Sequence, residues 1–216
     1  MRSSITHCFA ICAYKDSPYL ENCIESLKAQ TVKTNILLAT STPSEFIENL
    51  AKKYEIPYYV RQGKSDIQDD WNFAYDKAQA DYVTVAHQDD QYHPDYAKTM
   101  LEMCAKYDDV SLFLTDYLPI KGGELGKRDI NSKIRRLLRT PLKSARLANK
   151  IWWKKRVLCL GNSICCPAVT YHKARLGENI FTSEYKYNLD WDTFYKFACI
   201  PGRFVYADQP LTKLST

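Results

Sequence analysis

Four polar side chains that could bind a metal ion or a phosphate follow directly on one apolar run. Residues 82–86 are mostly apolar or β-branched, and His87, Gln88, Asp89 and Asp90 come next. Such a run is typical of a buried strand, so the polar residues should lie at its carboxyl end, where open α/β sheets bind ligands. Because side chains alternate along a strand, we expect His87 and Asp89 to share one face while Gln88 points away and Asp90 begins a turn. This predicts an oxygen-rich metal or phosphate site.

The two aspartates also have a purely structural interpretation. An Asp-Asp pair after a strand is common in turns and at helix N-caps, where the carboxylates accept backbone N–H groups. Residues 89 and 90 by themselves do not distinguish this role from ligand binding.

The elements that must position these residues alternate along the chain. The expected strands are residues 7–13, 35–39, 56–60, 82–86 and 110–115, and the expected helices between them are residues 19–27, 46–54, 69–80 and 96–107. This alternation predicts βαβ units, and therefore a Rossmann-like, mostly parallel sheet with helices on both faces. Further strands are expected at residues 164–173 and 204–206, and no GxGxxG fingerprint is present.

The composition is that of one globular domain. The chain has 216 residues, of which 45% are hydrophobic and 25% charged, which is enough for one sizeable core. No run approaches the roughly 20 apolar residues of a membrane span, and residues 1–6 lack the apolar core of a secretory signal. We therefore expect a cytoplasmic protein.

The positive charge is concentrated in one segment. Residues 121–156 hold 13 Lys and Arg against two acidic residues, a net charge of +11, whereas the other 180 residues hold 17 Lys and Arg against 23 Asp and Glu, a net charge of −6. Two apolar stripes predict basic amphipathic helices here, one with Ile134, Leu137 and Leu138 and one with Leu142, Ala145 and Trp152. The segment suits an anionic membrane surface or a phosphorylated lipid, and a solvated charged face is the open alternative. Nucleic acid is not expected, because no recognised binding module accompanies the charge.

The order of these segments resembles the inverting family 2 glycosyltransferases, which have the nucleotide-diphospho-sugar transferase (GT-A) fold. The similarity is close over residues 5–117 and looser over residues 160–211. It is carried by AYKDSPYLENCIESLKAQT, TSTPS, DDWNFAYDKAQADYV and AHQDD, in that order. The resemblance implies a nucleotide-sugar-binding half at residues 1–117, a basic helical insertion at 118–158 and an acceptor half at 159–216, all in one domain.

The resemblance also implies a role for particular residues. Contacts with the nucleotide-sugar fall on Tyr14, Thr40, Trp71, Asn72, His87 and Asp89. Asp89 takes the place of the second aspartate of the DxD motif, which binds the metal, and Asp90 follows it as a further ligand. Thr40, Trp71 and His87 depart from the usual residues at their positions, so the base and the metal dependence are less firmly implied than by a complete motif.

Residues 188–198, NLDWDTFYKFA, resemble the family motif that holds the catalytic base, and Asp190 matches that base. The alternative is that Asp190 and Asp192 cap a helix and compensate its dipole. The family also has a late histidine after a Pro-Leu pair such as Pro210 and Leu211. The sequence ends at Thr216 without it, so we expect that this ligand is missing or the chain truncated.

Taken together, these features predict a metal-dependent inverting glycosyltransferase that uses a nucleotide-sugar. UDP-sugars are the first candidates for this donor. Mn²⁺ or Mg²⁺ would neutralise the diphosphate leaving group. The expected acceptor is a glycan or a lipid-linked glycan of cell-wall or surface-polysaccharide synthesis, at the inner face of the membrane.

Two alternatives remain open. AHQDD also resembles the AHPDD zinc motif of N-acetylglucosaminyl deacetylases, although that motif lies on the first strand of its family and a later histidine pair completes the site. The other alternative is a nucleotide-sugar-fold protein that binds a partner without turnover. Turnover of a nucleotide-sugar would distinguish the transferase from the non-catalytic protein. The metal ligands present at the site would distinguish it from the zinc deacetylase.

Overall fold

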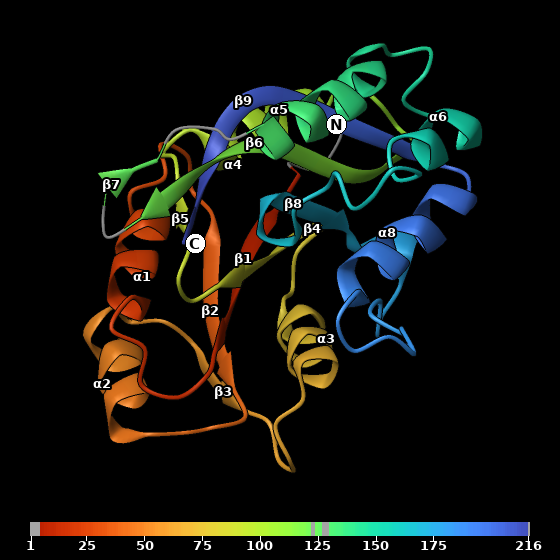
Figure 1. Ribbon diagram of the computed structural model, residues 1–216. Helices are drawn as coiled ribbons and strands as arrows, with labels where there is room; N and C mark the ends of the chain where they lie inside the picture. The colour runs from red at the N-terminus through yellow and green to blue at the C-terminus, as the bar shows by residue number, and fades with distance from the viewer. Residues whose placement is uncertain (1–4, 122–123, 127–129, 216) are drawn as a thin grey trace.

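One twisted sheet forms the centre of the protein (Figure 1). The computed structural model describes residues 5–121, 124–126 and 130–215. The strands of the sheet are β1 His7–Ala13, β2 Asn35–Thr40, β3 Tyr58–Val60, β4 Tyr82–His87, β5 Gln91–Tyr92, β6 Val110–Lys121, β7 Glu124–Leu125, β8 Val169–His172 and β9 Arg203–Ser215. Their order is β3-β2-β1-β4-β8-β6-β9-β5, and β7 pairs with β6. The strands from β3 to β4 are parallel, whereas β8 runs antiparallel to both β4 and β6.

Helices cover both faces of the sheet, as predicted. The α-helices are α1 Leu20–Lys28, α2 Glu45–Lys53, α3 Ile67–Lys77, α4 Tyr96–Cys104, α5 Ile130–Arg139, α6 Ile151–Arg156, α7 Lys173–Leu176 and α8 Leu189–Cys199. Along β1, Phe9 and Ile11 face a core with α1, α2 and α4, whereas Cys8 and Ala10 face a second core with α3 and α8. This alternation follows from the two-residue repeat of a strand. The predicted α/β architecture with helices on both faces is therefore confirmed.

Two strands of the second half are longer than predicted. β6 and β9 lie in parallel from Val110 and Arg203 to Ile120 and Ser215, through several register shifts. The local pattern marked only residues 110–115 and 204–206, because Pro119 and Pro210 interrupt the apolar run and the pairing partner is about 90 residues away. The strand expected at residues 164–173 begins only at Val169, since Pro167 lies in the 3₁₀ turn η2 Cys166–Ala168.

The basic segment folds differently from the prediction in its second part. The first predicted helix is confirmed as α5. The second is wrong: a 3₁₀ turn, η1 Thr140–Lys143, is followed by turns, and α6 begins only at Ile151. Leu142 is buried whereas Ala145 and Trp152 are exposed, so these three residues share no helical face. Residues 122–123 and 127–129 of the segment lie outside the described part of the chain.

Helix α5 directs two of its arginines, Arg136 and Arg139, toward acidic residues of the sheet. Arg139 is 1% exposed and donates a hydrogen bond of 2.8 Å to the buried Asp116 and another to the Ser163 carbonyl. Arg136 donates to Asp208 at 2.8 Å. The apolar side of this helix, with Ile130, Ile134 and Leu137, is exposed instead. The polarity of α5 is therefore opposite to that of an ordinary surface helix.

Candidate active site

A pocket of about 460 Å³ opens where β1 and β4 end and α3 begins. We call it the strand-end pocket. It lies at the carboxyl ends of parallel strands, where open α/β sheets bind ligands. Four predicted contact residues, Tyr14, Trp71, His87 and Asp89, meet here. The residues that line it are Cys12, Ala13, Tyr14, Ser65, Asp66, Ile67, Asp70, Trp71, His87, Gln88 and Asp89.

His87 and Trp71 form one wall of the strand-end pocket. Their rings stack with centroids 4.8 Å apart and an interplanar angle of 24°. Burial lowers the pKa of His87 to about 4, against the opposing effect of Asp89, so the imidazole is neutral at pH 7. Its Nε2 atom is buried and has no hydrogen-bond partner within the described part of the chain. A neutral imidazole with an open nitrogen can accept or donate one hydrogen bond to a ligand, depending on its tautomer.

Gln88 also lines the pocket, and the expectation that it points away was wrong. The Tyr14 backbone N–H donates to its Oε1 at 2.9 Å, and its Nε2 donates to the Tyr14 carbonyl at 3.0 Å. The strand ends at His87, so the alternation of side chains stops there. Gln88 thus fixes the backbone of Tyr14, which is itself half exposed at the pocket mouth.

The structure separates the two aspartates that follow β4. Asp89 is exposed and lines the pocket. Asp90 is 4% exposed, is not among the lining residues, and accepts the Ser215 backbone N–H of β9 at 3.1 Å. Burial, with a contribution from Asp89, raises the pKa of Asp90 to about 8. Asp90 therefore takes part in joining the chain after β4 to β9, and only Asp89 of the pair reaches the pocket.

The acidic groups of the pocket fit a cation that the substrate helps to hold. Within the described residues, no three His, Cys, Asp or Glu side chains gather closely enough to hold a metal ion by themselves. Mg²⁺ and Mn²⁺ accept oxygen ligands, and Mg²⁺ is commonly bound by one or two carboxylates together with substrate phosphates. The exposed carboxylate of Asp89 at the pocket matches that arrangement. A zinc deacetylase, which needs several protein ligands, does not.

A network around Asp70, which the sequence analysis missed, holds another wall of the pocket. Arg61 Nε donates to Asp70 Oδ1 at 2.7 Å, and the hydroxyls of Ser41 and Ser65 each donate to Oδ2 at 2.8 Å. These contacts tie α3 to the ends of β2 and β3. The DDWN segment singled out Trp71 and Asn72 in the sequence. The three partners of Asp70 lie in other segments, so sequence spacing could not predict these contacts.

Two predicted contact residues lie outside the lining of the pocket. Thr40 is buried at the end of β2, and its hydroxyl accepts the backbone N–H of Thr42 at 3.0 Å. Asn72 exchanges two hydrogen bonds with the backbone of Phe181, donating at 2.8 Å and accepting at 2.9 Å. Both side chains are therefore engaged with the backbone of neighbouring segments.

Asp190 lies in the first turn of α8, apart from the lining of the pocket. Asn162 Nδ2 donates to its Oδ2 at 2.7 Å, and the Trp191 N–H donates to its Oδ1 at 2.8 Å. Burial raises the pKa of Asp190, which these hydrogen bonds and the positive charge of Arg135 partly offset. Burial and the charges of Asp90 and Asp190 together raise the pKa of the Cys165 thiol, so this residue lies within electrostatic reach of both aspartates.

Asp192 has a different environment from Asp190. It forms an ion pair with Lys196 at 2.7 Å, one helical turn further along α8. The residue before the helix, Asn188, makes no side-chain cap, and neither aspartate occupies the N-cap position. Neither aspartate is therefore the N-cap, but both lie in the first turn of α8, where a carboxylate also compensates the helix dipole.

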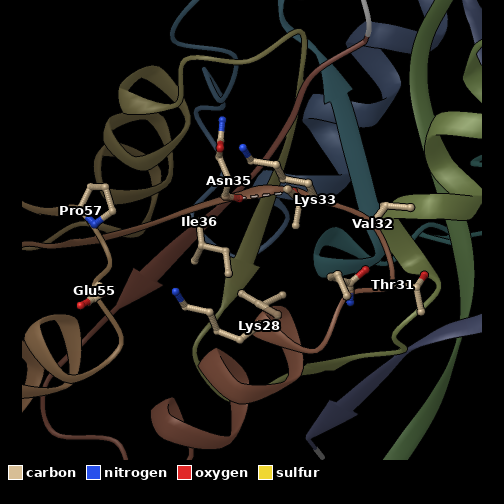
Figure 2. A pocket seen from close by; sticks show the side chains of 11 residues that line it. Lys28, Thr31, Val32, Lys33, Asn35, Ile36, Glu55 and Pro57 are labelled. Carbon is tan, nitrogen blue, oxygen red and sulfur yellow. Dashed lines mark hydrogen bonds between the residues drawn. The ribbon is translucent and has the colours of Figure 1, made fainter.

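Figure 2 shows another pocket, of about 490 Å³, at the amino end of β2. Lys28, Lys33, Asn35 and Glu55 are among the residues that line it. Ligand sites of open α/β sheets lie at the opposite, carboxyl ends of the strands, so this pocket is not the counterpart of the strand-end pocket.

The parallel strands β3-β2-β1-β4 and the pocket at their carboxyl ends define an α/β protein with a ligand site at the strand ends. Residues 8–167 match the sequence profile of Glycosyl transferase family 2, and the chain belongs to this family. The predicted family is thereby confirmed. No curated protein matches the sequence significantly.

Solved structures share the fold at low sequence identity. The structure of S. aureus TarS 1-349 in complex with UDP is similar with a TM-score of 0.71 and 14% identity, over 98% of this chain and 61% of that one. The mannosyltransferase PcManGT from Pyrobaculum calidifontis, in complex with GDP-Man and Mn²⁺, is similar with a TM-score of 0.67 and 11% identity, over 99% of this chain and 57% of that one. The chain thus spans less than two thirds of the length of these proteins. At these identities the likeness shows the fold alone.

Proposed function

We propose that the protein is a metal-dependent inverting glycosyltransferase that takes a sugar from a nucleotide-sugar, with UDP-sugars the first candidates. The observation that carries the proposal is the strand-end pocket, which combines a stacked Trp71–His87 wall with the exposed carboxylate of Asp89. The nucleotide-bound complexes of TarS and PcManGT support a nucleotide-sugar as the ligand, because both proteins share the fold.

Each residue has a proposed role in this reaction. Tyr14 contacts the base, and Trp71 and His87 contact the diphosphate and sugar. Asp89 holds a Mn²⁺ or Mg²⁺ ion, which supplies positive charge to the diphosphate leaving group. Thr40, Asn72 and Asp90 are buried and hydrogen-bonded to other parts of the protein. Their positions therefore give less support to direct ligand contacts by Thr40 and Asn72 and to metal binding by Asp90.

Asp190 is the proposed general base. It accepts the proton of the acceptor hydroxyl as that oxygen bonds to the anomeric carbon from the face opposite the diphosphate. The bond between the anomeric carbon and the diphosphate oxygen breaks, and the nucleoside diphosphate leaves with the electron pair. The anomeric configuration is inverted by this single displacement.

The acceptor and the cellular site are part of the same proposal. We infer a glycan or lipid-linked glycan of cell-wall or surface-polysaccharide synthesis, with the enzyme at the cytoplasmic face of the membrane. The cationic segment from residue 121 to residue 156 supports peripheral contact with anionic lipid. No helix in the described ranges is long and apolar enough to cross a membrane.

Calorimetric titration of the protein with UDP-, GDP-, CMP- and dTDP-sugars tests the proposal. With Mn²⁺ present, one nucleotide class should bind, and EDTA or Asp89→Ala should weaken that binding at least tenfold because the diphosphate loses its counter-charge. Glu102→Ala, which removes an exposed carboxylate on α4 outside the pocket, is the matched control and should bind normally. Failure of every nucleotide to bind would contradict the proposal. Binding without transfer to any acceptor would favour the non-catalytic alternative.

A further inference from the structure

A groove of about 310 Å³ runs between α5 and the turn that follows α6. We call it the α5 groove. It is lined by Asn131, Ile134, Arg135, Leu138, Leu160, Gly161 and Asn162. Asn162 is also the hydrogen-bond partner of Asp190. The groove therefore adjoins the proposed general base, where the reacting hydroxyl of the acceptor must lie.

The polar side of the α5 groove favours an anion. Arg135 lies in it, is close enough to Asp190 to act on its charge, and donates to the Tyr117 hydroxyl at 3.3 Å. The sequence has no Asp or Glu from residue 130 to residue 177, so this part of the chain has no carboxylate of its own. A guanidinium group binds a phosphate through paired N–H donors, and the amides of Asn131 and Asn162 add further donors.

The other side of the groove is apolar and continues onto an exposed surface. Ile134, Leu138 and Leu160 line it, and Leu160 is 71% exposed. Ile134 also belongs to the outward stripe of α5 with Ile130 and Leu137, the last of which is 70% exposed. Since Arg136 and Arg139 hold the helix by its charged side, this stripe remains on the surface. The helix itself lies near β6 and β9 (Figure 1). A contiguous exposed apolar patch of this kind is typical of an interaction site.

We propose that the α5 groove binds the acceptor, and that this acceptor is a glycosyl phosphate ester of a long hydrocarbon alcohol. The phosphate lies beside Arg135, the hydrocarbon runs along Leu138, Leu160 and Ile134 toward the outward stripe, and the sugar points to Asp190. The inference rests on the proposed function, which it deepens by naming the acceptor class. Charge complementarity and the joining of cation and apolar surface in one groove select this class over a free polysaccharide.

Binding of decyl phosphate, below its critical micelle concentration, tests the groove without any knowledge of the sugar. Calorimetry should give a Kd at least tenfold lower for decyl phosphate than for inorganic phosphate or for the neutral decyl glucoside. Arg135→Gln and Leu160→Ser should each raise that Kd about tenfold, since one removes the cation and the other apolar contact. Lys133→Gln, an exposed cation on the same helix, and Phe46→Ser, an exposed apolar residue on α2, are the matched controls and should bind as the unchanged protein does.

Titration of the same samples with UDP separates this inference from the proposed function. Normal UDP binding in all variants together with weakened decyl phosphate binding in the two groove variants is the expected result. Equal decyl phosphate binding in every variant, or no binding at all, overturns the groove even if UDP binds. Loss of binding in Leu137→Ser but not in Leu160→Ser also overturns it, because the lipid would then lie on the outward stripe as it does on a membrane surface. Failure of every nucleotide of the panel to bind, in the unchanged protein as well as in the variants, would instead count against the proposed function.

Discussion

At the scale of single residues, the surroundings of each carboxylate decide what it can do. Asp90 is buried against β9, Asp192 is paired with Lys196, and Asp70 holds Arg61 and two serines. Asp89 keeps its oxygens exposed at the strand-end pocket. Asp190 is partly buried, with a raised pKa, beside the α5 groove. The sequence shows all five as aspartates in short acidic runs, and the structure gives each a distinct environment.

We expect Asp190→Asn to lower transfer by about 10²-fold to 10⁴-fold, the usual contribution of a general base, without weakening nucleotide binding. Because burial raises the pKa of Asp190, kcat/KM should fall with decreasing pH at a higher pH than an ordinary aspartate would give. Asn162→Ala removes a hydrogen bond that favours the charged form, so this fall should move to higher pH. Rate measurements over pH check both effects. Asp192→Asn is the control, and full transfer by Asp190→Asn would remove this residue as the base.

At the scale of elements, a basic amphipathic helix such as α5 can pack on the core with either its apolar face or its charged face. The apolar stripe usually packs on the core, and the charges face water. Here Asp116 and Asp208 bind Arg139 and Arg136 on the inner side of the helix, and the apolar stripe faces outward. The Arg139–Asp116 pair is almost completely buried and Arg139 also reaches the Ser163 carbonyl, which connects α5 to the turn that carries Asn162.

Arg139→Met should destabilise the protein by about 3–5 kcal/mol, because it leaves the buried Asp116 without its main counter-charge. Urea unfolding at neutral pH measures this change. Lys133→Met, which removes a solvent-exposed cation from the same helix, should stay within about 0.5 kcal/mol of the unchanged protein. A loss of less than about 1 kcal/mol in Arg139→Met would show that the inward pair does not hold α5 in place.

At the scale of the whole molecule, a line of polar groups crosses the buried centre of the sheet. His7 on β1 contacts Thr34 Oγ1 at 2.7 Å and Thr84 Oγ1 at 2.9 Å, and Thr84 contacts Thr170 on β8 at 2.6 Å. The Tyr96 hydroxyl of α4 completes the line at 2.9 Å from Thr170. These contacts join the parallel half of the sheet to its antiparallel half. Burial lowers the pKa of His7 to about 3, so its imidazole is neutral in the folded protein.

His7 should make the protein less stable in mild acid. The unfolded chain takes up a proton at His7 below about pH 6.5, while the folded protein does not until about pH 3, so stability is lost as the pH falls through this window. Between about pH 7.5 and about pH 5.5, the free energy of unfolding should fall by about 1 kcal/mol more than in His7→Gln, which cannot titrate. Urea unfolding at the two pH values measures the difference. Equal losses in both proteins would mean that His7 is protonated in the fold.

Local pattern was sufficient for much of the fold. The alternation of apolar runs with amphipathic helices predicted β1 to β4 and α1 to α4, because each strand or helix buries a face that its own residues define. The family resemblance placed Tyr14, Thr40, Trp71, Asn72, His87 and Asp89 at one site, and all of them except Thr40 and Asn72 line the strand-end pocket. The orientation of α5, the length of β6 and β9 and the partners of Asp70 could not be predicted this way.

By itself the sequence determined the family, the parallel half of the sheet and the position of an acidic site after the strand at residues 82–86. The strands and the acidic site depend on residues that are close together in the chain, and the family depends on the order of such short segments along it. Only the tertiary structure decided that Asp89 reaches the pocket while Asp90 is bonded to β9, that Gln88 holds Tyr14, and that α5 presents its apolar stripe outward beside Asp190. Each of these depends on contacts between segments far apart in the chain. Charge and burial in the folded protein determine which residues pair, and a local sequence pattern contains no information about either.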